Sequence, residues 1–160
     1  MDRRQLLTAS AATGLASVAT PSRAREDDEQ DLVGSWYGTI TATNPPLREF
    51  NDLISFYVGG VVTETRRYLV LPTPFGNLLE TTGHGAWEPT GRNTFEAFFR
   101  FLLQKQRDGA AIGTDNIRLW LTLGPGRGRL TGTFESQIKD PAETVLLAVT
   151  GTFSAIPITV

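Results

Sequence analysis

A single histidine limits the chemistry that this chain of 160 residues can perform. A Ser-His-Asp triad would have to use His84, and the chain has no Gly-x-Ser-x-Gly nucleophile motif. In a strand, His84 and Glu88 share the face opposite Trp87, which favours an outward position for both. One histidine and no cysteine exclude a multi-histidine or thiolate metal site, and no Asp-x-Asp-x-Asp loop offers calcium ligands. We therefore predict no catalytic residue, no metal site and no cofactor.

Charged residues inside predicted strands are the second candidates for chemistry. Glu64 and Arg66 lie in one such run, Glu96 and Arg100 share a face of another, and Arg118 lies in a third. Because unpaired charge in a core is costly, we interpret these residues as solvated charges of the outer face. Some of them would form cross-strand pairs worth less than about 1 kcal/mol each. The alternative is that Glu64 or Arg66 points inward and anchors the polar end of a ligand.

The elements that carry these residues are strands, because apolar and polar residues alternate along most of the chain. Strands are predicted at 32–43, 53–58, 61–71, 82–88, 93–103, 117–123, 129–138 and 144–156. Turn signals such as Gly59-Gly60 separate them, and Pro72, Pro74 and Gly76 predict a loop. Exposed sheet edges invite association, and eight strands are enough to close, although a sandwich would bury the same faces. We predict an all-β fold with a single antiparallel up-and-down eight-stranded barrel.

The first residues are predicted to be an export signal rather than part of the fold. Residues 1–24 have a charged start with Arg3-Arg4, a short apolar middle and a small-x-Ala ending at Ala24. The paired arginines resemble a twin-arginine signal; an ordinary secretory signal is the alternative. We expect export to the periplasm or medium after cleavage near Ala24, a flexible arm over 25–31 and a barrel domain over 32–160.

Charge and cysteine usage narrow the partners of the exported protein. The chain has 15 Lys and Arg against 17 Asp and Glu, and the signal removes three arginines and one aspartate. An acidic protein is a poor match for nucleic acid or an anionic membrane surface, and we expect neither nucleic-acid binding nor stable membrane insertion. Without cysteine, no disulfide supports the fold. The oligomeric state is left open.

Two sequence patterns resemble a known group of proteins. Gly34-Ser35-Trp36 resembles the Gly-x-Trp signature of lipocalins and related calycin barrels. The stretch from Gly83 to Phe95, the aromatic run after it and Leu130–Phe134 are similar to small exported bacterial proteins of lipocalin-like type, a group largely without assigned function. The chain departs from lipocalins in having no arginine near the end of its last strand to lie over the Trp. Arg118 or Arg129 could take that place.

The resemblance implies a lumen that binds small apolar molecules, and the residues at inward positions are its candidate lining. They are Trp36, Tyr57, Tyr68, Trp87, Phe95, Phe99, Phe101, Leu119, Leu121, Phe134 and Phe153. A solid core made of the same side chains is the alternative, because eight strands permit both. We predict a binding protein for a small hydrophobic molecule rather than an enzyme. The alternatives are a non-hydrolytic cyclase or isomerase for a lipid or polyketide, which a tyrosine or glutamate in the lumen would favour, and a ligand-free interaction barrel.

Overall fold

The computed structural model describes residues 31–44, 48–66, 71–73 and 76–160, and most of them lie in strands. The strands are β1 Gly34–Asn44, β2 Arg48–Tyr57, β3 Val61–Arg66, β4 Leu71–Thr73, β5 Gly76–Glu80, β6 Gly83–Gly91, β7 Thr94–Lys105, β8 Ala111–Leu123, β9 Leu130–Lys139 and β10 Val145–Pro157. A 3₁₀ turn, Pro125–Arg127, joins β8 to β9. The predicted signal 1–24 and all of the predicted arm except Asp31 lie outside the described residues. Within these ranges no helix has the length and apolar character needed to span a bilayer.

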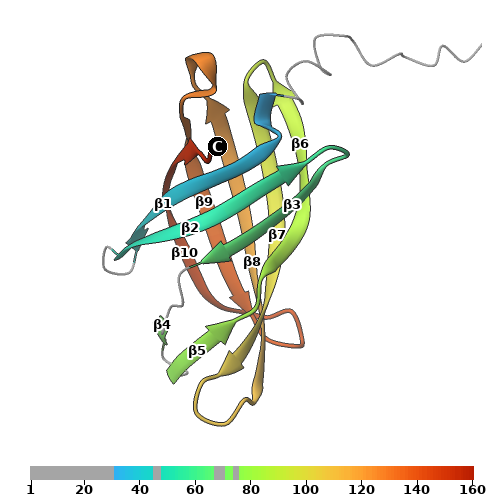
Figure 1. Ribbon diagram of the computed structural model, residues 1–160. Coiled ribbons are helices and arrows are strands. Elements are labelled where there is room, and N and C mark those ends of the chain that lie inside the picture. The colour runs from blue at the N-terminus through green and yellow to red at the C-terminus, as the bar shows by residue number, and fades with distance from the viewer. Residues whose placement is uncertain (1–30, 45–47, 67–70, 74–75) are drawn as a thin grey trace, which may run out of the picture.

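The sheet closes into a barrel, as predicted (Figure 1). Each strand pairs antiparallel with the next along the ring β1-β2-β3-β6-β7-β8-β9-β10, and β10 pairs back onto β1. Gly38 faces Ala155 in the closing pair and Asp52 on the other side of β1. Eight strands therefore form the ring in up-and-down order, which removes the exposed edges that an open sheet would have.

Several elements depart from the prediction. β2 begins at Arg48 rather than 53. The predicted third strand over 61–71 ends at Arg66 within the described residues, and the predicted loop contains the hairpin β4–β5, which turns at Gly76 with a φ of +92°. β5 continues the line of β6 along β7, because Glu80 pairs with Leu103 and His84 pairs with Arg100. β8 begins at Ala111 rather than 117. The prediction missed its first half because the polar residues there do not alternate regularly with apolar ones.

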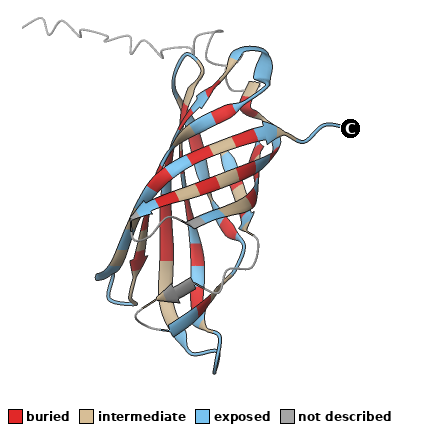
Figure 2. Cartoon of the chain, turned by 90° about the vertical axis from the view of Figure 1, so that its left-hand side faces the viewer, coloured by how far each residue is buried: buried red, intermediate tan, exposed pale blue. Residues whose placement is uncertain are grey.

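Burial alternates along the strands with the period of two that the sequence predicts (Figure 2). The main apolar cluster fills most of the barrel and includes Trp36, Phe56, Trp87, Phe95, Phe99 and Phe153. Its aromatic rings meet edge to face, with centroids 5.8 Å apart for Phe56 and Trp87. A second, smaller cluster of Leu78, Leu103 and Ile138 lies beyond it on β5, β7 and β9.

The Gly34–Trp36 stretch contributes Trp36 to the main cluster. Trp36 is buried, and its Nε1 donates a hydrogen bond to the Leu32 carbonyl at 3.1 Å. Arg127 Nη2 donates to the Val33 carbonyl at 2.9 Å, so the turn after β8 holds the segment that leads into β1. The two arginines named from the sequence have other partners: Arg118 pairs with Glu96, and Arg129 donates to Ser154.

Candidate functional site

A layer of charged side chains crosses the barrel interior between the two apolar clusters. We define this polar layer by Asp52 on β2, Glu64 and Arg66 on β3, Glu80 on β5, Asp115 on β8 and Ser136 on β9. On β9, Ser136 lies between Phe134 of the main cluster and Ile138 of the small one. All six side chains are buried or nearly so. The interpretation of Glu64 and Arg66 as solvated outer charges is therefore wrong.

Arg66 lies at the centre of the layer. Its Nε donates to Glu64 Oε1 at 3.0 Å, and its Nη1 lies 3.3 Å from Glu80 Oε2 and 3.5 Å from Asp115 Oδ2. Burial disfavours the charge on Arg66, but the attraction of these carboxylates outweighs it and raises the pKa of the guanidinium above its ordinary value. Arg66 is thus a fixed positive charge shared among acids from three strands.

Aromatic rings and a hydroxyl complete the surroundings of this charge. The Arg66 Cζ atom lies 4.4 Å from the centroid of the Phe101 ring and 5.7 Å from that of Phe50. A guanidinium over an aromatic face is attracted to the π electrons, and the ring keeps water from that side. Ser136 Oγ donates to Asp115 Oδ1 at 2.6 Å, which occupies the oxygen that does not face Arg66. The guanidinium therefore has little freedom to turn.

The layer contains four acids and one base, and bound protons neutralise part of its excess negative charge. Burial raises the pKa of Glu64 to about 8, that of Glu80 to about 7 and that of Asp52 to about 6. The neighbouring carboxyl of Asp52 adds to the rise in the pKa of Glu64, and that of Asp115 adds to the rise in the pKa of Glu80. Carboxyl groups this near to one another repel when both are ionised. Near neutral pH the layer is consequently partly protonated.

One donor in the layer has no partner among the described residues. Asp52 Oδ1, Glu64 Oε2 and Glu80 Oε1 also have no donor there, and a proton bound to the layer can supply one. For Arg66 Nη2, protonating an acid cannot provide the acceptor that it needs. Buried polar groups in native proteins are nearly always bonded to protein or to an ordered molecule. This nitrogen therefore needs an acceptor that the described side chains do not supply.

Gly38 on β1 makes room for the acid at the edge of the layer. It faces Asp52 across the β1–β2 pair, and a Cβ built at Gly38 would collide with Asp52 Oδ1 and would lie 2.8 Å from the Phe153 ring. We expect Gly38→Ala to lower the free energy of unfolding by about 1–3 kcal/mol, the usual cost of overpacking, in urea denaturation. Gly128→Ala is the control, because a Cβ at Gly128 meets only an ordinary contact at 3.8 Å. Equal stability of the two variants would contradict the tight contact.

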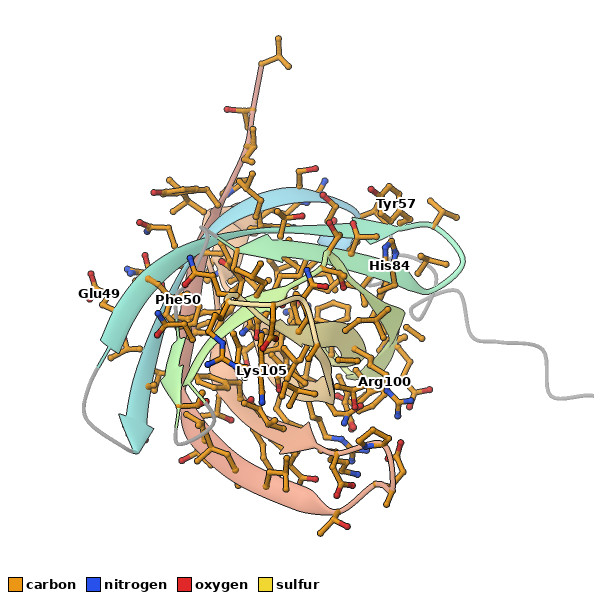
Figure 3. All side chains as sticks on the ribbon, turned by 90° about the horizontal axis from the view of Figure 1, so that it is seen from below. Glu49, Phe50, Tyr57, His84, Arg100 and Lys105 are labelled. Carbon is orange, nitrogen blue, oxygen red and sulfur yellow. The ribbon has the colours of Figure 1, made fainter. Side chains whose placement is uncertain are left out.

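The structure brings most of the predicted lumen residues together, with one correction. Trp36, Trp87, Phe95, Phe99, Phe101, Leu119, Leu121, Phe134 and Phe153 are all buried inside the barrel. Tyr57 is 49% exposed and lies on the outer side of β2, where it does not reach the lumen (Figure 3). Tyr57 lies on the same face of β2 as Leu53, which is also exposed, whereas Ile54 and Phe56 point inward. Tyr68 lies outside the described residues.

The other charged candidates lie outside the barrel, as interpreted from the sequence. His84 and Glu88 are exposed, and so is Arg100, whose Nε donates to Asn116 Oδ1 at 2.6 Å. Glu96 and Arg118 form a cross-strand ion pair at 3.3 Å on the outer face. No group of three or more metal-ligating side chains among the described residues is placed to hold a metal ion.

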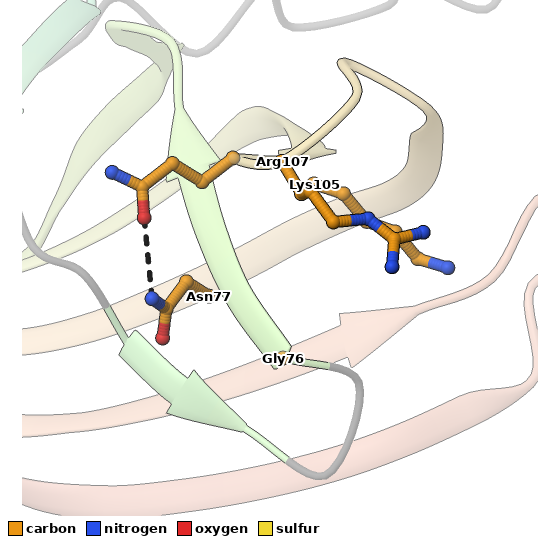
Figure 4. A pocket seen from close by; sticks show the side chains of 5 residues that line it. Gly76, Asn77, Lys105 and Arg107 are labelled. Atoms are coloured by element: carbon orange, nitrogen blue, oxygen red, sulfur yellow. Dashed lines mark hydrogen bonds between the residues drawn. The ribbon is translucent and has the colours of Figure 1, made fainter.

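A surface depression of about 340 Å³ lies apart from the polar layer (Figure 4). It is lined by Gly76, Asn77, Lys105, Gln106 and Arg107, at the start of β5 and the hairpin between β7 and β8. Asn77 donates to Gln106 Oε1 at 3.2 Å across it, and Arg107 pairs with Asp108. None of the predicted lumen residues lines it. Its exposed, solvated side chains give no chemical reason to place a function there.

Alternation along the strands is the sequence signal that places these polar side chains inside the barrel, although it does not show which of them meet. Asp115 lies on the same face of β8 as Ile117, Leu119 and Leu121. Glu64 lies on the same face of β3 as Val62, and Ser136 on the same face of β9 as Phe134 and Ile138. The general rule that charges face water predicts the opposite face for Glu64 and Arg66.

Searches against models of known protein families, against curated proteins and among solved structures found no significant match. The closed antiparallel eight-stranded barrel is compatible with a lipocalin-like fold. The case for a function rests on the interior of the barrel.

Proposed function

We propose that this protein binds a small, largely apolar molecule inside the barrel and holds the polar group of that molecule at the polar layer. The observation that carries the proposal is the buried Arg66 Nη2, for which the described part of the chain provides no acceptor. A core that served stability alone would gain little from an arginine and four acids in its middle, because a buried charge cluster is often no better than apolar packing. A bound molecule with a hydrogen-bond acceptor would supply the partner that Arg66 Nη2 lacks, and this would account for the cluster.

The apolar part of the molecule would contact the aromatic wall next to the layer. Phe99 and Phe101 lie along β7 with ring centroids 5.8 Å apart, and Phe101 also covers Arg66. At roughly 25 cal/mol per Å², a ligand burying about 200 Å² of apolar surface gains about 5 kcal/mol before the entropic cost of association. Because the rings pack edge to face, binding requires that some of them change rotamer.

Native mass spectrometry and tryptophan fluorescence test this function. We expect the protein purified from its own host to retain a small molecule, whose mass identifies its class. Titration with 2-octanone should change the emission of the buried Trp36 and Trp87, whereas Trp120 is 41% exposed on the outer face. The change should persist in Trp120→Phe and be reduced in Trp87→Phe. An apo mass together with emission that no apolar probe alters would refute binding in the interior.

The proposal also includes export of the protein and a relation to the calycin barrels. Residues 1–24 have the composition of a signal peptide, and we propose that the protein acts in the periplasm or the medium. N-terminal sequencing of the exported protein should begin close to Arg25. The Gly34–Trp36 stretch, with Trp36 buried at the start of β1, supports a relation to the calycin barrels.

A second candidate function is a non-hydrolytic isomerase or cyclase, and one observation favours it. Burial brings the pKa values of Glu64 and Glu80 close to neutral pH, where an acid can both take up and release a proton. Exchange of the α-hydrogens of bound 2-octanone for deuterium, followed by NMR, tests it. Exchange that disappears in Glu64→Gln but not in Glu96→Gln would favour the enzyme, and binding without exchange would favour the carrier.

A further inference from the structure

The polar layer has a hydrogen-bonding pattern that specifies the ligand's polar group. Among the described residues, Arg66 Nη2 is its donor without a partner, and carboxyl oxygens of Asp52, Glu64 and Glu80 are its acceptors without one. All belong to one cluster, since Arg66 contacts Glu64 and Glu80 directly and Asp52 lies opposite Arg66 across the β2–β3 pair. The side chains of Arg66 and Glu64 are 7% and 1% exposed, so bulk water does not compensate these groups.

We propose that this layer selects a ligand with an uncharged oxygen acceptor, a ketone or hydroxyl group, and rejects both carboxylates and ammonium groups. The inference rests on the proposed function, because it names the class of molecule that the interior takes. A carbonyl or hydroxyl oxygen accepts from Arg66 Nη2 and adds no charge to the layer. A hydroxyl can in addition donate to a free carboxyl oxygen.

Charged head groups fit less well for opposite reasons. A carboxylate would accept from Arg66 but would enter a cluster in which four carboxyl groups already face a single guanidinium. An ammonium group would meet the fixed charge of Arg66 and would leave Nη2 without an acceptor, because it can only donate. Buried like charges and unpaired buried donors each cost enough to change affinity tenfold or more, at about 1.4 kcal/mol per factor of ten.

Four probes with the same eight-carbon chain test the selection: 2-octanone, 1-fluorooctane, octanoate and octylammonium. A purely apolar cavity would bind 1-fluorooctane more tightly than the ketone, because the ketone loses hydrogen bonds to water. We expect the reverse order here, with the dissociation constant of 2-octanone about tenfold lower than those of the other three. Tryptophan fluorescence and native mass spectrometry measure the four constants on the whole protein at pH 7.

Arg66→Lys assigns the preference to the layer, with Arg118→Lys as the matched control on the outer face. Arg66→Lys keeps the positive charge but removes the Nη2 donor, so the preference for the ketone over 1-fluorooctane should fall severalfold. Arg118→Lys should leave it unchanged. A wild-type protein that prefers 1-fluorooctane or binds octanoate or octylammonium as tightly as the ketone overturns the selection, and so does a preference that survives in Arg66→Lys. Failure of all four probes to bind would instead refute the proposed function.

Discussion

Replacing Arg66 by methionine is expected to lower the free energy of unfolding by about 3–5 kcal/mol at pH 7. Methionine has a similar length and fills part of the volume, so the loss is chiefly electrostatic. Without the guanidinium, Glu64, Glu80 and Asp115 lose their nearest positive charge inside the barrel. The carboxyl groups would then have to remain protonated or face one another as buried like charges. Urea denaturation followed by circular dichroism measures the change.

The outer ion pair provides the control for this variant. Arg118 is about half exposed and pairs with Glu96 at 3.3 Å, so Arg118→Met should cost less than about 1 kcal/mol. The penalty for Arg66→Met should also shrink at pH 5, where protons neutralise Glu64 and Glu80. A loss of similar size in both variants, or one that does not depend on pH, would contradict a buried charge cluster centred on Arg66.

The sequence predicted the ring of the barrel well because its strands show their inward faces locally. Phe95, Phe99 and Phe101 follow one another at a period of two, and all three are buried on β7. Alternation needs no knowledge of distant partners, so it also predicted that Trp36 and Trp87 are buried. Alternation did not predict the ends of the strands, and it missed the β4–β5 hairpin, where prolines indicated a loop.

The polar layer could not be derived in the same way, because its partners are far apart in the sequence. Arg66 contacts Glu80, 14 residues later, and Asp115, 49 residues later. Only the register of a closed barrel shows that these acids surround it. Without that register, an isolated Glu64 and Arg66 looked like surface charges, since the cost of burying either alone is high. Tyr57 was misplaced for a different reason: it was named as a tyrosine that could act in the lumen, whereas it shares the outer face of β2 with the exposed Leu53.

Stability should fall by several kcal/mol as the pH rises from 5 to 8. The acids responsible are Glu64, Glu80 and Asp52, whose folded-state pKa values are raised by burial to about 8, 7 and 6. Their unfolded values are near 4.5 for glutamate and 3.8 for aspartate. The folded state thus binds more protons than the unfolded state between these values. Its stability is full below about pH 4–5 on this account and is lost as the pH passes through the folded-state values.

Glu64→Gln separates this effect from the general titration of the surface. The amide resembles the protonated acid in shape and keeps both a donor and an acceptor, but it cannot ionise. We expect the variant to match the wild type at pH 5 and to keep more of that stability at pH 8, so its stability curve is flatter. Glu96→Gln, on the outer face, should leave the slope of the wild type unchanged. If the wild type were equally stable at pH 5 and pH 8, the layer would not hold protons at neutral pH, and an arginine with fully ionised acids would have to be tolerated inside the barrel.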